Sequence, residues 1–295
     1  MYNNDLQLTD PTIDRLNEYV EESIEKHRIS DDTLKQCMYT EIKVIGKGAF
    51  GSIILCEKTV NNAQQRCVLK VVKKKYDYAK EDTYMEIFLQ TSLKHPQIVK
   101  CAGWYETETS YVLELEHIDG QDLFEVCRVK RLSREEILDC ALQLLGIMVY
   151  LKVNNVIHRD IKPENIIVDS FGRLHLCDFG LATVVKSNAF RTTNARAVGT
   201  IDYMTPEMIN YREYGFGTDM WAYGVLLYEL VYRSPPFTKN NNSYGTMIAI
   251  QKMKVNFDEK RQELYFINDL LKNIFVEDIR RIRIENCINH PYFTS

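Results

Sequence analysis

His158-Arg159-Asp160-Ile161-Lys162-Pro163-Glu164-Asn165 is the stretch whose side chains decide how this chain should fold and react. Phosphoryl transfer depends on positioning and charge neutralisation more than on covalent chemistry by the protein. Asp160 can accept or orient the proton of an attacking hydroxyl. Lys162, two residues later, can neutralise charge on the transferred phosphate. The stretch therefore predicts a phosphoryl-transfer site.

A second motif, Asp178-Phe179-Gly180, follows after an interval of predicted strands and a turn. Asn165 from the first motif and Asp178 from the second offer hard oxygen ligands of the kind that Mg²⁺ prefers. Neither motif is informative alone, but their order and spacing are. Together they indicate that the phosphoryl-transfer site uses magnesium.

A glycine-rich stretch, Gly46-Lys47-Gly48-Ala49-Phe50-Gly51, lies in a part of the chain that is predicted to be rich in strands. Alone, this pattern fits a dinucleotide-binding βαβ unit or a simple turn. The residues that follow, Ser52 to Glu57, are predicted to continue as a strand, whereas a dinucleotide site needs a helix there. We therefore favour a hairpin whose glycines let backbone amides approach phosphates.

A lysine within an apolar strand, Lys70, lies about twenty residues after the glycines. Alone it would be interpreted as a surface lysine, but after a glycine loop at this spacing it becomes a candidate phosphate ligand. A lysine in an apolar strand needs a counter-charge. Glu86, on the next predicted helix, is the natural partner, although alone it would be interpreted as a solvated helix residue.

From about Tyr39 to Phe293 the chain resembles the eukaryotic protein kinase family. The resemblance implies an α+β, bilobal fold with a small β-rich N-lobe, a larger α-helical C-lobe and ATP between them. We expect residues 39–116 to form the N-lobe and residues 117–295 the C-lobe. Residues 1–38 would be an acidic, partly helical N-terminal extension.

The resemblance also implies a role for individual residues. Asp160, Lys162, Lys70, Glu86 and Thr200 would be catalytic, and Thr200 would form hydrogen bonds near Asp160 and Lys162. Mg²⁺ would be held by Asn165 and Asp178. ATP would contact a set drawn from both lobes: Ile45, Gly46, Gly48, Gly51, Ile53, Val68, Lys70, Leu115, Glu116, Ile118, Asp122 and Ile167.

Two further features of the family would support the site. Glu207, near the end of the activation segment, would pair with Arg281. Asp219, in a buried helix predicted over residues 219–232, would anchor the loop that carries Asp160.

The kind of kinase follows from finer resemblances. Lys162 in its motif resembles Ser/Thr kinases rather than tyrosine kinases, and Gln90 and residues 199–209 resemble the Aurora group. This similarity implies a role in the cell cycle and an activating protein on the N-lobe. A set of acidic residues matches positions that select basic residues upstream of the target hydroxyl: Asp122, Glu164 and Glu229.

The activation segment carries two candidate phosphorylation sites, Thr193 and Thr192, of which Thr193 is favoured. Arg159, beside the catalytic Asp, could bind the phosphate and order the loop. The segment departs from the Aurora pattern because the linker at Asn194 to Val198 is about three residues longer than is usual in Auroras. In addition, Arg196 stands where many related kinases have the activating threonine. An unmodified surface loop is the alternative.

Residues 1–38 contain nine acidic and four basic residues, a net charge of −5. Asp10 and Pro11 are typical of a helix start. An apolar stripe at helical spacing follows, formed by Ile13, Leu16, Val20 and Ile24. We expect a helix that either packs on the main domain or binds a regulatory partner.

Composition and charge limit the kinds of partner and the locations that we expect for this chain. The net charge of −4 gives no basic field for nucleic acid. No apolar run approaches the length of a membrane span. Eight scattered cysteines without a CxxC pair, and no export signal, favour reduced thiols in the cytoplasm or nucleus. We expect a monomer that acts on protein substrates.

Three alternatives stay open at this point. A pseudokinase scaffold would lack Lys70, Asp160 or Asp178, and all three are present. A small-molecule kinase would lack the Glu207–Arg281 arrangement. A Polo-like or calcium/calmodulin-dependent kinase would carry a further module after the last lobe helix, and we expect none there.

Overall fold

The computed structural model describes residues 13–48, 51–74, 79–185, 199–239 and 242–294. The described residues divide into two compact units. The small unit runs as far as Asp119 and also includes Cys177–Gly180. The large unit comprises Gly120–Leu176 and the residues from Leu181 onward.

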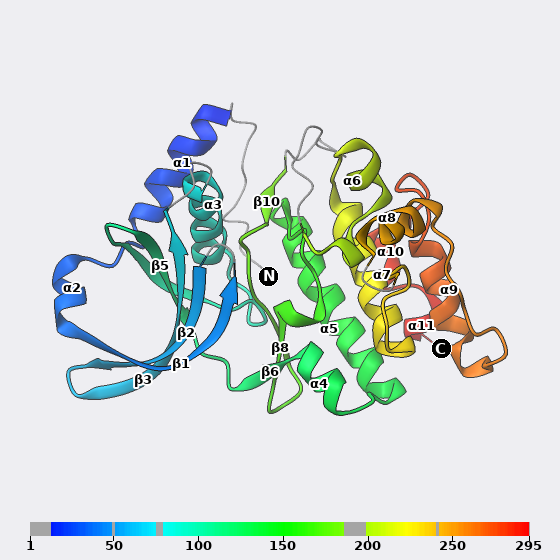
Figure 1. The fold of residues 1–295 in the computed structure, drawn as a ribbon, viewed down its shortest axis with the longest axis horizontal. Helices are drawn as coiled ribbons and strands as arrows, with labels where there is room; N and C mark the ends of the chain where they lie inside the picture. The colour runs from blue at the N-terminus through cyan, green and yellow to red at the C-terminus, as the bar shows by residue number, and fades with distance from the viewer. Residues whose placement is uncertain (1–12, 49–50, 75–78, 186–198, 240–241, 295) are drawn as a thin grey trace. The chain divides into compact units, whose positions relative to one another are not determined.

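The small unit is built on a five-stranded antiparallel sheet in the order β1-β2-β3-β5-β4 (Figure 1). A two-residue turn, Asn61-Asn62, joins β2 to β3, and both residues have positive φ angles of 48° and 63°. Asparagine tolerates this conformation, and such turns match the twist of the strands they join. The strands are β1 (Cys37–Gly48), β2 (Gly51–Val60), β3 (Ala63–Lys73), β4 (Cys101–Glu106) and β5 (Ser110–Glu116).

Three helices complete the described part of the small unit: α1 (Ile13–Glu25), α2 (Asp31–Gln36) and α3 (Ala79–Ser92). In Figure 1, α1 lies beside α3, and the two helices are in contact. The apolar face of the sheet includes a cluster formed by Cys56, Cys67, Leu69 and Val112.

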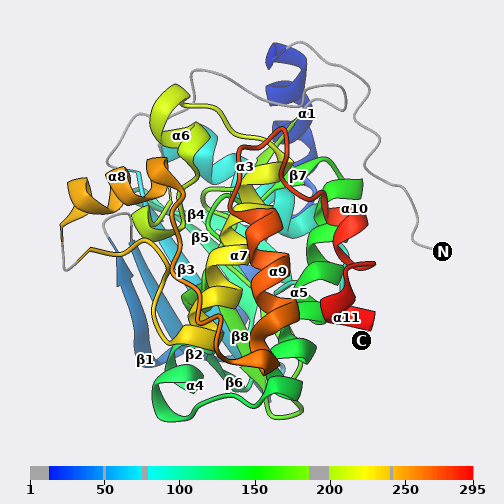
Figure 2. The same ribbon diagram turned by 90° about the vertical axis from the view of Figure 1, so that its right-hand side faces the viewer.

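The large unit is mainly helical. Figure 2 shows α5, α7 and α9 beside one another, and α7 contacts both of the others. Its helices are α4 (Leu123–Val129), α5 (Arg134–Val153), α6 (Pro206–Tyr211), α7 (Phe216–Tyr232), α8 (Ser243–Lys252), α9 (Tyr265–Ile274), α10 (Ile284–Cys287) and α11 (Pro291–Thr294). Short 3₁₀ turns lie at η1 (Pro163–Asn165), η2 (Ile201–Tyr203) and η3 (Gln262–Leu264).

Two small sheets carry the loops of the large unit. One has the order β6-β8-β9 and the other pairs β10 with β7. The strands are β6 (Gly120–Asp122), β7 (Val156–Ile157), β8 (Ile166–Asp169), β9 (Leu174–Leu176) and β10 (Thr183–Val184). The two sheets thus place residues 158–165 between short strands β7 and β8.

The structure confirms the α+β architecture and corrects some element boundaries. A capping box formed by Ser133 and Glu136 begins α5. The buried helix predicted from Asp219 begins earlier, at Phe216, because the Thr218 hydroxyl accepts a hydrogen bond from the Gly215 N–H and caps the first turn. The predicted helix start at Asp10 and Pro11 lies outside the described residues.

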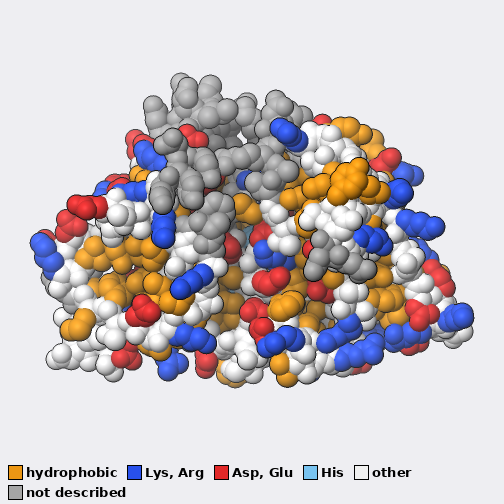
Figure 3. Space-filling model, viewed as in Figure 1, with side chains coloured by type: hydrophobic (Ala, Val, Ile, Leu, Met, Phe, Trp, Pro, Cys, Tyr) orange, Lys and Arg blue, Asp and Glu red, His pale blue; other side chains and the backbone are white. Residues whose placement is uncertain are grey.

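Figure 3 shows Lys and Arg side chains interspersed with Asp and Glu over the face in view, so charges of both signs share it. Among the residues that the structure describes, no helix is both long and apolar enough to cross a bilayer.

Candidate active site

In the small unit, Lys70 lies on β3 between two neighbouring strands, paired with Ile53 of β2 and Leu113 of β5. Its ammonium group contacts Glu86 of α3 through a charged hydrogen bond and Asp178 Oδ1 at 2.7 Å. Glu86 is buried, with 3% of its surface exposed. The structure thus brings Asp178 into contact with Lys70, although the sequence places these two residues over a hundred positions apart.

The charges in this cluster support one another. Burial alone would lower the pKa of Lys70, but Glu86 and Asp178 outweigh burial and raise that pKa above its ordinary value. Lys70 is therefore protonated at neutral pH. A buried cation with two acidic partners is a fixed positive charge, the kind of group that phosphate binding requires.

The backbone around Asp178 is held in an uncommon conformation. Asp178 has a φ angle of 63°, in the left-handed region. Its Oδ1 accepts a hydrogen bond from the Gly180 N–H at 3.3 Å. Residues other than glycine adopt this backbone conformation at a cost in free energy, and such residues concentrate at functional sites.

The glycine-rich turn has a structural reason of its own. A Cβ atom on Gly51 would lie 1.7 Å from the Val71 carbonyl oxygen of β3, so only glycine fits this position. The predicted hairpin is present, since β1 pairs with β2 as far as Gly48 and Gly51. The tip of the turn, residues 49–50, lies outside the described residues.

The other expected ATP contacts of the small unit lie on the same sheet. Val68 and Leu115 pair directly between β3 and β5, and both are buried. Ile45 is half exposed. The Glu116 N–H donates to the Lys100 carbonyl, so a backbone contact from Glu116 to adenine would have to come from its carbonyl group.

Gln90 of α3, the residue that resembles the Aurora group, is almost fully buried. Its Nε2 donates to the Val99 carbonyl at 3.1 Å, whereas its Oε1 has no hydrogen-bond partner among the described residues. Gln90 lines a pocket of about 500 Å³.

In the large unit, Asp160 is held by three neighbours. Asn165 Nδ2 donates to Asp160 Oδ2 at 2.9 Å and to its carbonyl at 2.8 Å. Lys162 Nζ lies 2.7 Å from Asp160 Oδ2. The Thr200 N–H and hydroxyl each donate to Asp160 Oδ1 at 3.1 Å.

Thr200 completes the cluster by a second contact, because Lys162 Nζ donates to its Oγ1 at 2.8 Å. The hydrogen bonds expected of Thr200 are therefore confirmed. Gly199, just before it, has a φ angle of 100°, and a Cβ there would lie 2.8 Å from the Arg159 carbonyl. Glycine at this position lets the Thr200 segment approach the loop of Asp160.

Helix α7 fixes the loop that carries Asp160. Asp219 accepts hydrogen bonds from the His158 N–H at 2.8 Å and from the Arg159 N–H at 2.9 Å. Arg159 has a φ angle of 65°, so the carboxylate stabilises a strained backbone. This arrangement confirms the expected anchoring role of Asp219.

Asp122 and Ile167, the ATP contacts expected in the large unit, face each other between β6 and β8. Asp122 has a second role that the sequence did not reveal. Its Oδ1 accepts the Glu125 N–H at 2.8 Å and so caps α4. Aspartate is among the preferred N-cap residues, and this signal could have been found.

An acidic group surrounds Tyr203 of η2. The Tyr203 hydroxyl donates to Glu229, and burial together with the charges of Glu229 and Glu164 raises the pKa of Tyr203. Burial also raises the pKa of the Glu229 carboxyl. The sequence alone did not indicate a function for Tyr203.

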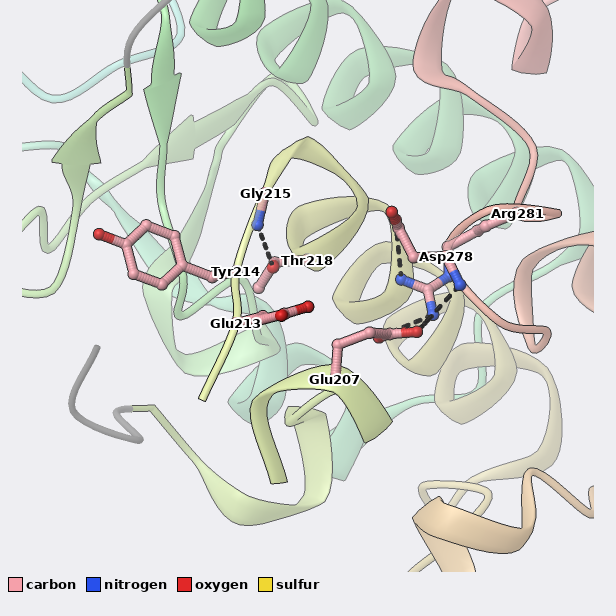
Figure 4. A pocket seen from close by; sticks show the side chains of 7 residues that line it. All are labelled: Glu207, Glu213, Tyr214, Gly215, Thr218, Asp278 and Arg281. Carbon is pink, nitrogen blue, oxygen red and sulfur yellow. Dashed lines mark hydrogen bonds and ion pairs between the residues drawn. The ribbon is translucent and has the colours of Figure 1, made fainter. Parts of the chain in front are cut away.

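The Glu207–Arg281 pair is present as predicted (Figure 4). Arg281 NH2 lies 3.1 Å from both Glu207 oxygens, and its guanidinium stacks 4.9 Å above the Trp221 ring. The pocket beside the pair has a volume of about 10 Å³, room for a single water molecule. Its lining residues are Glu207, Glu213, Tyr214, Gly215, Thr218, Asp278 and Arg281. We interpret the Glu207–Arg281 pair as a structural anchor.

The expected site residues therefore fall into two sets. Lys70, Glu86 and Asp178 cluster in the small unit, and Asp160, Lys162, Asn165 and Thr200 cluster in the large unit. The candidate phosphorylation sites Thr192 and Thr193 lie outside the described residues.

A fold with a β-rich unit and a helical unit, and these two charged clusters, defines a protein kinase. The profile of the protein kinase domain family matches residues 39–293, and the chain belongs to this family. It is a Ser/Thr protein kinase with similarity to the Aurora kinases.

Individual relatives support the assignment to the Ser/Thr protein kinases. An Aurora kinase of Saccharomyces cerevisiae is 32% identical over 258 residues, 85% of this chain and 67% of that protein. The Ser/Thr-protein kinase Aurora-2 of Arabidopsis thaliana is 29% identical over 86% of this chain and 89% of its own length. A probable myosin light chain kinase of Dictyostelium discoideum is 31% identical over 87% of this chain and 54% of its own length.

Proposed function

We propose that this protein transfers the γ-phosphoryl group of Mg-ATP to Ser and Thr hydroxyls of protein substrates that carry basic residues upstream. The observation that carries the proposal is the cluster around Asp160. Three side chains, Lys162, Asn165 and Thr200, hold its carboxylate within hydrogen-bond distance. A fixed carboxylate of this kind can orient a hydroxyl and accept its proton.

The roles within the large unit follow from this geometry. Asp160 would accept the proton of the attacking hydroxyl. Lys162, placed between Asp160 and Thr200, would neutralise charge that develops on the transferred group. Thr200 would hold the side chains of Lys162 and Asp160 in position relative to each other.

In the small unit, the Lys70 ammonium would bind ATP phosphates, with Glu86 holding it in place. The backbone of residues 46–51 would cover the same phosphates. Val68 and Leu115 would contact the adenine ring.

Asn165 and Asp178 are the residues that would hold Mg²⁺. An amide oxygen and a carboxylate suit this hard cation, which keeps waters and phosphate oxygens as further ligands. When bound, the ion supplies charge neutralisation on the phosphates. Among the described residues, no group of three or more His, Cys, Asp and Glu side chains is placed to hold a metal ion by itself.

The preference for basic substrates rests on the acidic group of the large unit. Glu229 is partly desolvated, and the neighbouring charge of Glu164 opposes its ionisation. An arginine from a substrate would relieve this unfavourable charge density. Asp122 would contribute more weakly, since one of its oxygens caps α4.

A peptide-library assay tests the proposal. Incubation with labelled ATP and Mg²⁺ should phosphorylate Ser and Thr peptides with Arg or Lys upstream, and a chelator should abolish the signal. Phosphorylation confined to tyrosine would contradict the residue specificity. Equal use of acidic and basic peptides would contradict the substrate preference.

We also propose that phosphorylation of Thr193, or else Thr192, activates the enzyme. Arg159 is the candidate phosphate ligand, and its guanidinium now lies 4.7 Å from the Tyr214 ring centre. Mass spectrometry of active enzyme should locate phosphate at Thr193. Full activity of Thr193→Ala would contradict this switch.

A cytoplasmic or nuclear location and a role in the cell cycle complete the proposal. All eight cysteines are free thiols, which suits a reducing compartment. Imaging of a tagged protein would test the location, and a signal in the secretory pathway would contradict it. Division defects after depletion would support the cell-cycle role, and normal division would count against it.

Two proposals concern assembly. We propose a monomer, which light scattering would test and a dimer mass would contradict. An activating protein on the N-lobe, suggested by the Aurora similarity, should appear as a partner that raises activity on binding; unchanged activity with every bound partner would contradict it.

A further inference from the structure

The N-terminal segment, residues 13–29, is packed against the helix that carries Glu86. Val20 and Ile24 of α1 are 4% and 1% exposed. The Tyr19 ring meets the Phe88 ring of α3 edge-on at 5.8 Å between centroids. Lys80 near the start of α3 pairs with Glu21 at 3.1 Å. Of the described elements, α1 is the one with which α3 shares the most contacts.

The end of the same segment is attached to the sheet. Ile29 N–H donates to the Trp104 carbonyl at 2.7 Å, and Trp104 N–H donates to the His27 carbonyl at 3.2 Å. The Trp104 indole N–H donates to the Ile24 carbonyl at 2.8 Å. Arg28 covers the Trp104 ring at 5.3 Å. The segment is therefore fastened to both α3 and β4.

Gly103 shows that β4 is fitted to this segment. A Cβ on Gly103 would lie 2.8 Å from Ile29 Cγ1 and 2.9 Å from the His27 carbonyl oxygen. Contacts under 3.0 Å force a shift, and here one of the two atoms belongs to the backbone. Any side chain at position 103 would push the segment away from β4.

We propose that the N-terminal segment is a built-in positioning element that holds α3 so that Glu86 stays against Lys70. Glu86 lies on the same helix as Phe88 and is fully dependent on the placement of α3 for its contact with Lys70. This inference rests on the proposed role of Lys70 and Glu86 in ATP binding. Within the described residues, α1 packs on α3 of the small unit, as in the first of the two expectations for this segment.

The residues that pack against α3 here belong to the chain itself. A helix that is fastened between a second helix and a strand loses the freedom to swing away from β3. The fraction of molecules with an intact Lys70–Glu86 pair should therefore depend on Ile24 and Gly103, which are not among the residues expected to bind ATP.

The test uses the full chain with three variants. Ile24→Ser removes the buried anchor of α1, Gly103→Ala displaces residues 27–29, and Glu22→Ala is the matched control on the exposed face of α1. Hydrogen exchange of residues 79–92 and steady-state kinetics would be measured on each. We expect both anchor variants to speed exchange in α3 and to lower kcat/KM about tenfold or more, with the control unchanged.

A double-mutant cycle with Glu86→Gln separates positioning from general stability. If the segment acts through Glu86, Ile24→Ser should cause little further loss in residual activity when Glu86 is already replaced. A fully additive loss, or unchanged exchange and kinetics in both anchor variants, would overturn the proposal. If Ile24→Ser does not fold, the milder Gly103→Ala takes its place in the cycle.

Failure of this positioning role can be distinguished from failure of the proposed function. Hydrogen exchange reports the attachment of α3 without any catalysis. A wild-type chain without kinase activity would overturn the proposed function, whereas an active wild type whose anchor variants behave normally would overturn only the positioning role.

Discussion

At the scale of single residues, the cluster around Asp160 is the most informative part of the molecule. Thr200 contributes both its N–H and its hydroxyl to one Asp160 oxygen and accepts a hydrogen bond from Lys162. Hydrogen bonds to charged groups contribute about 1.5–3 kcal/mol each. Because the hydroxyl connects Asp160 to Lys162, we expect its loss to affect the reaction directly.

Thr200→Ala should lower kcat by about ten- to a hundredfold. The reason is that Lys162 and Asp160 lose the hydroxyl that connects them, whereas Lys70, the proposed ATP ligand, is unchanged. Steady-state kinetics would show the KM for ATP nearly unchanged. Thr200→Ser, which keeps the hydroxyl, serves as the control, and equal losses in the two variants would contradict this role.

A second residue-scale prediction concerns Glu229. Because burial raises the pKa of its carboxyl, Glu229 becomes neutral at a higher pH than an exposed glutamate as acid is added. The preference for an Arg peptide over its Ala counterpart should therefore weaken as pH falls through that raised pKa. The ratio of kcat/KM for the two peptides would be followed from neutral to acidic pH.

The matched variant for this experiment is Glu229→Gln. Its ratio should be low, about tenfold below wild type, and should not change with pH through this group. A wild-type ratio that rises on acidification would contradict the assignment of Glu229.

At the scale of elements, α6 and α7 are joined to the C-terminal part of the large unit by the Glu207–Arg281 pair. The Arg281 side chain is 1% exposed and donates to the carbonyls of Gly217, Ile274 and Val276. Burial lowers the pKa of Arg281, which shows the cost of desolvating this cation. Removing the Glu207 carboxylate would leave this buried charge with only the more distant carboxylate of Asp278, 3.6 Å away.

Glu207→Gln should accordingly lower the free energy of unfolding by about 3–5 kcal/mol. Urea denaturation would measure the change. Glu263→Gln breaks the exposed Arg261–Glu263 pair and is the control, with an expected effect within about 0.5 kcal/mol. Similar effects of the two variants would show that the buried pair is not an anchor.

The elements also show what the sequence could and could not predict. Strand cores such as Ser52 to Glu57 were predicted because β-branched residues and turn signals are local. Strand β2 extends to Val60 because the Asn61-Asn62 turn prolongs its pairing with β3. Cross-strand partners were out of reach: buried Glu114 accepts hydrogen bonds from Tyr39 at 2.6 Å and Lys58 at 2.8 Å, and these depend on strand order.

At the scale of the whole molecule, the proposed reaction needs residues from both units. Cys177–Gly180 belongs to the small unit by its contacts, although it follows most of the catalytic residues of the large unit in the sequence. This explains why Asp178 meets Lys70. The motif resemblance predicted the residues of both clusters, whereas the fastening of the N-terminal segment through Trp104 and Gly103 could not be predicted, because nothing local marks it.

The central claim, that Asp160 performs phosphoryl transfer in this chain, has one most direct test. Transfer of labelled phosphate from Mg-ATP to a basic Ser peptide should be compared between wild type and Asp160→Asn. Asparagine keeps the shape but cannot accept the proton, so we predict a fall in kcat of about 10²–10⁴-fold with an unchanged melting temperature. Wild-type activity in Asp160→Asn, or no activity in the wild type, would contradict the account.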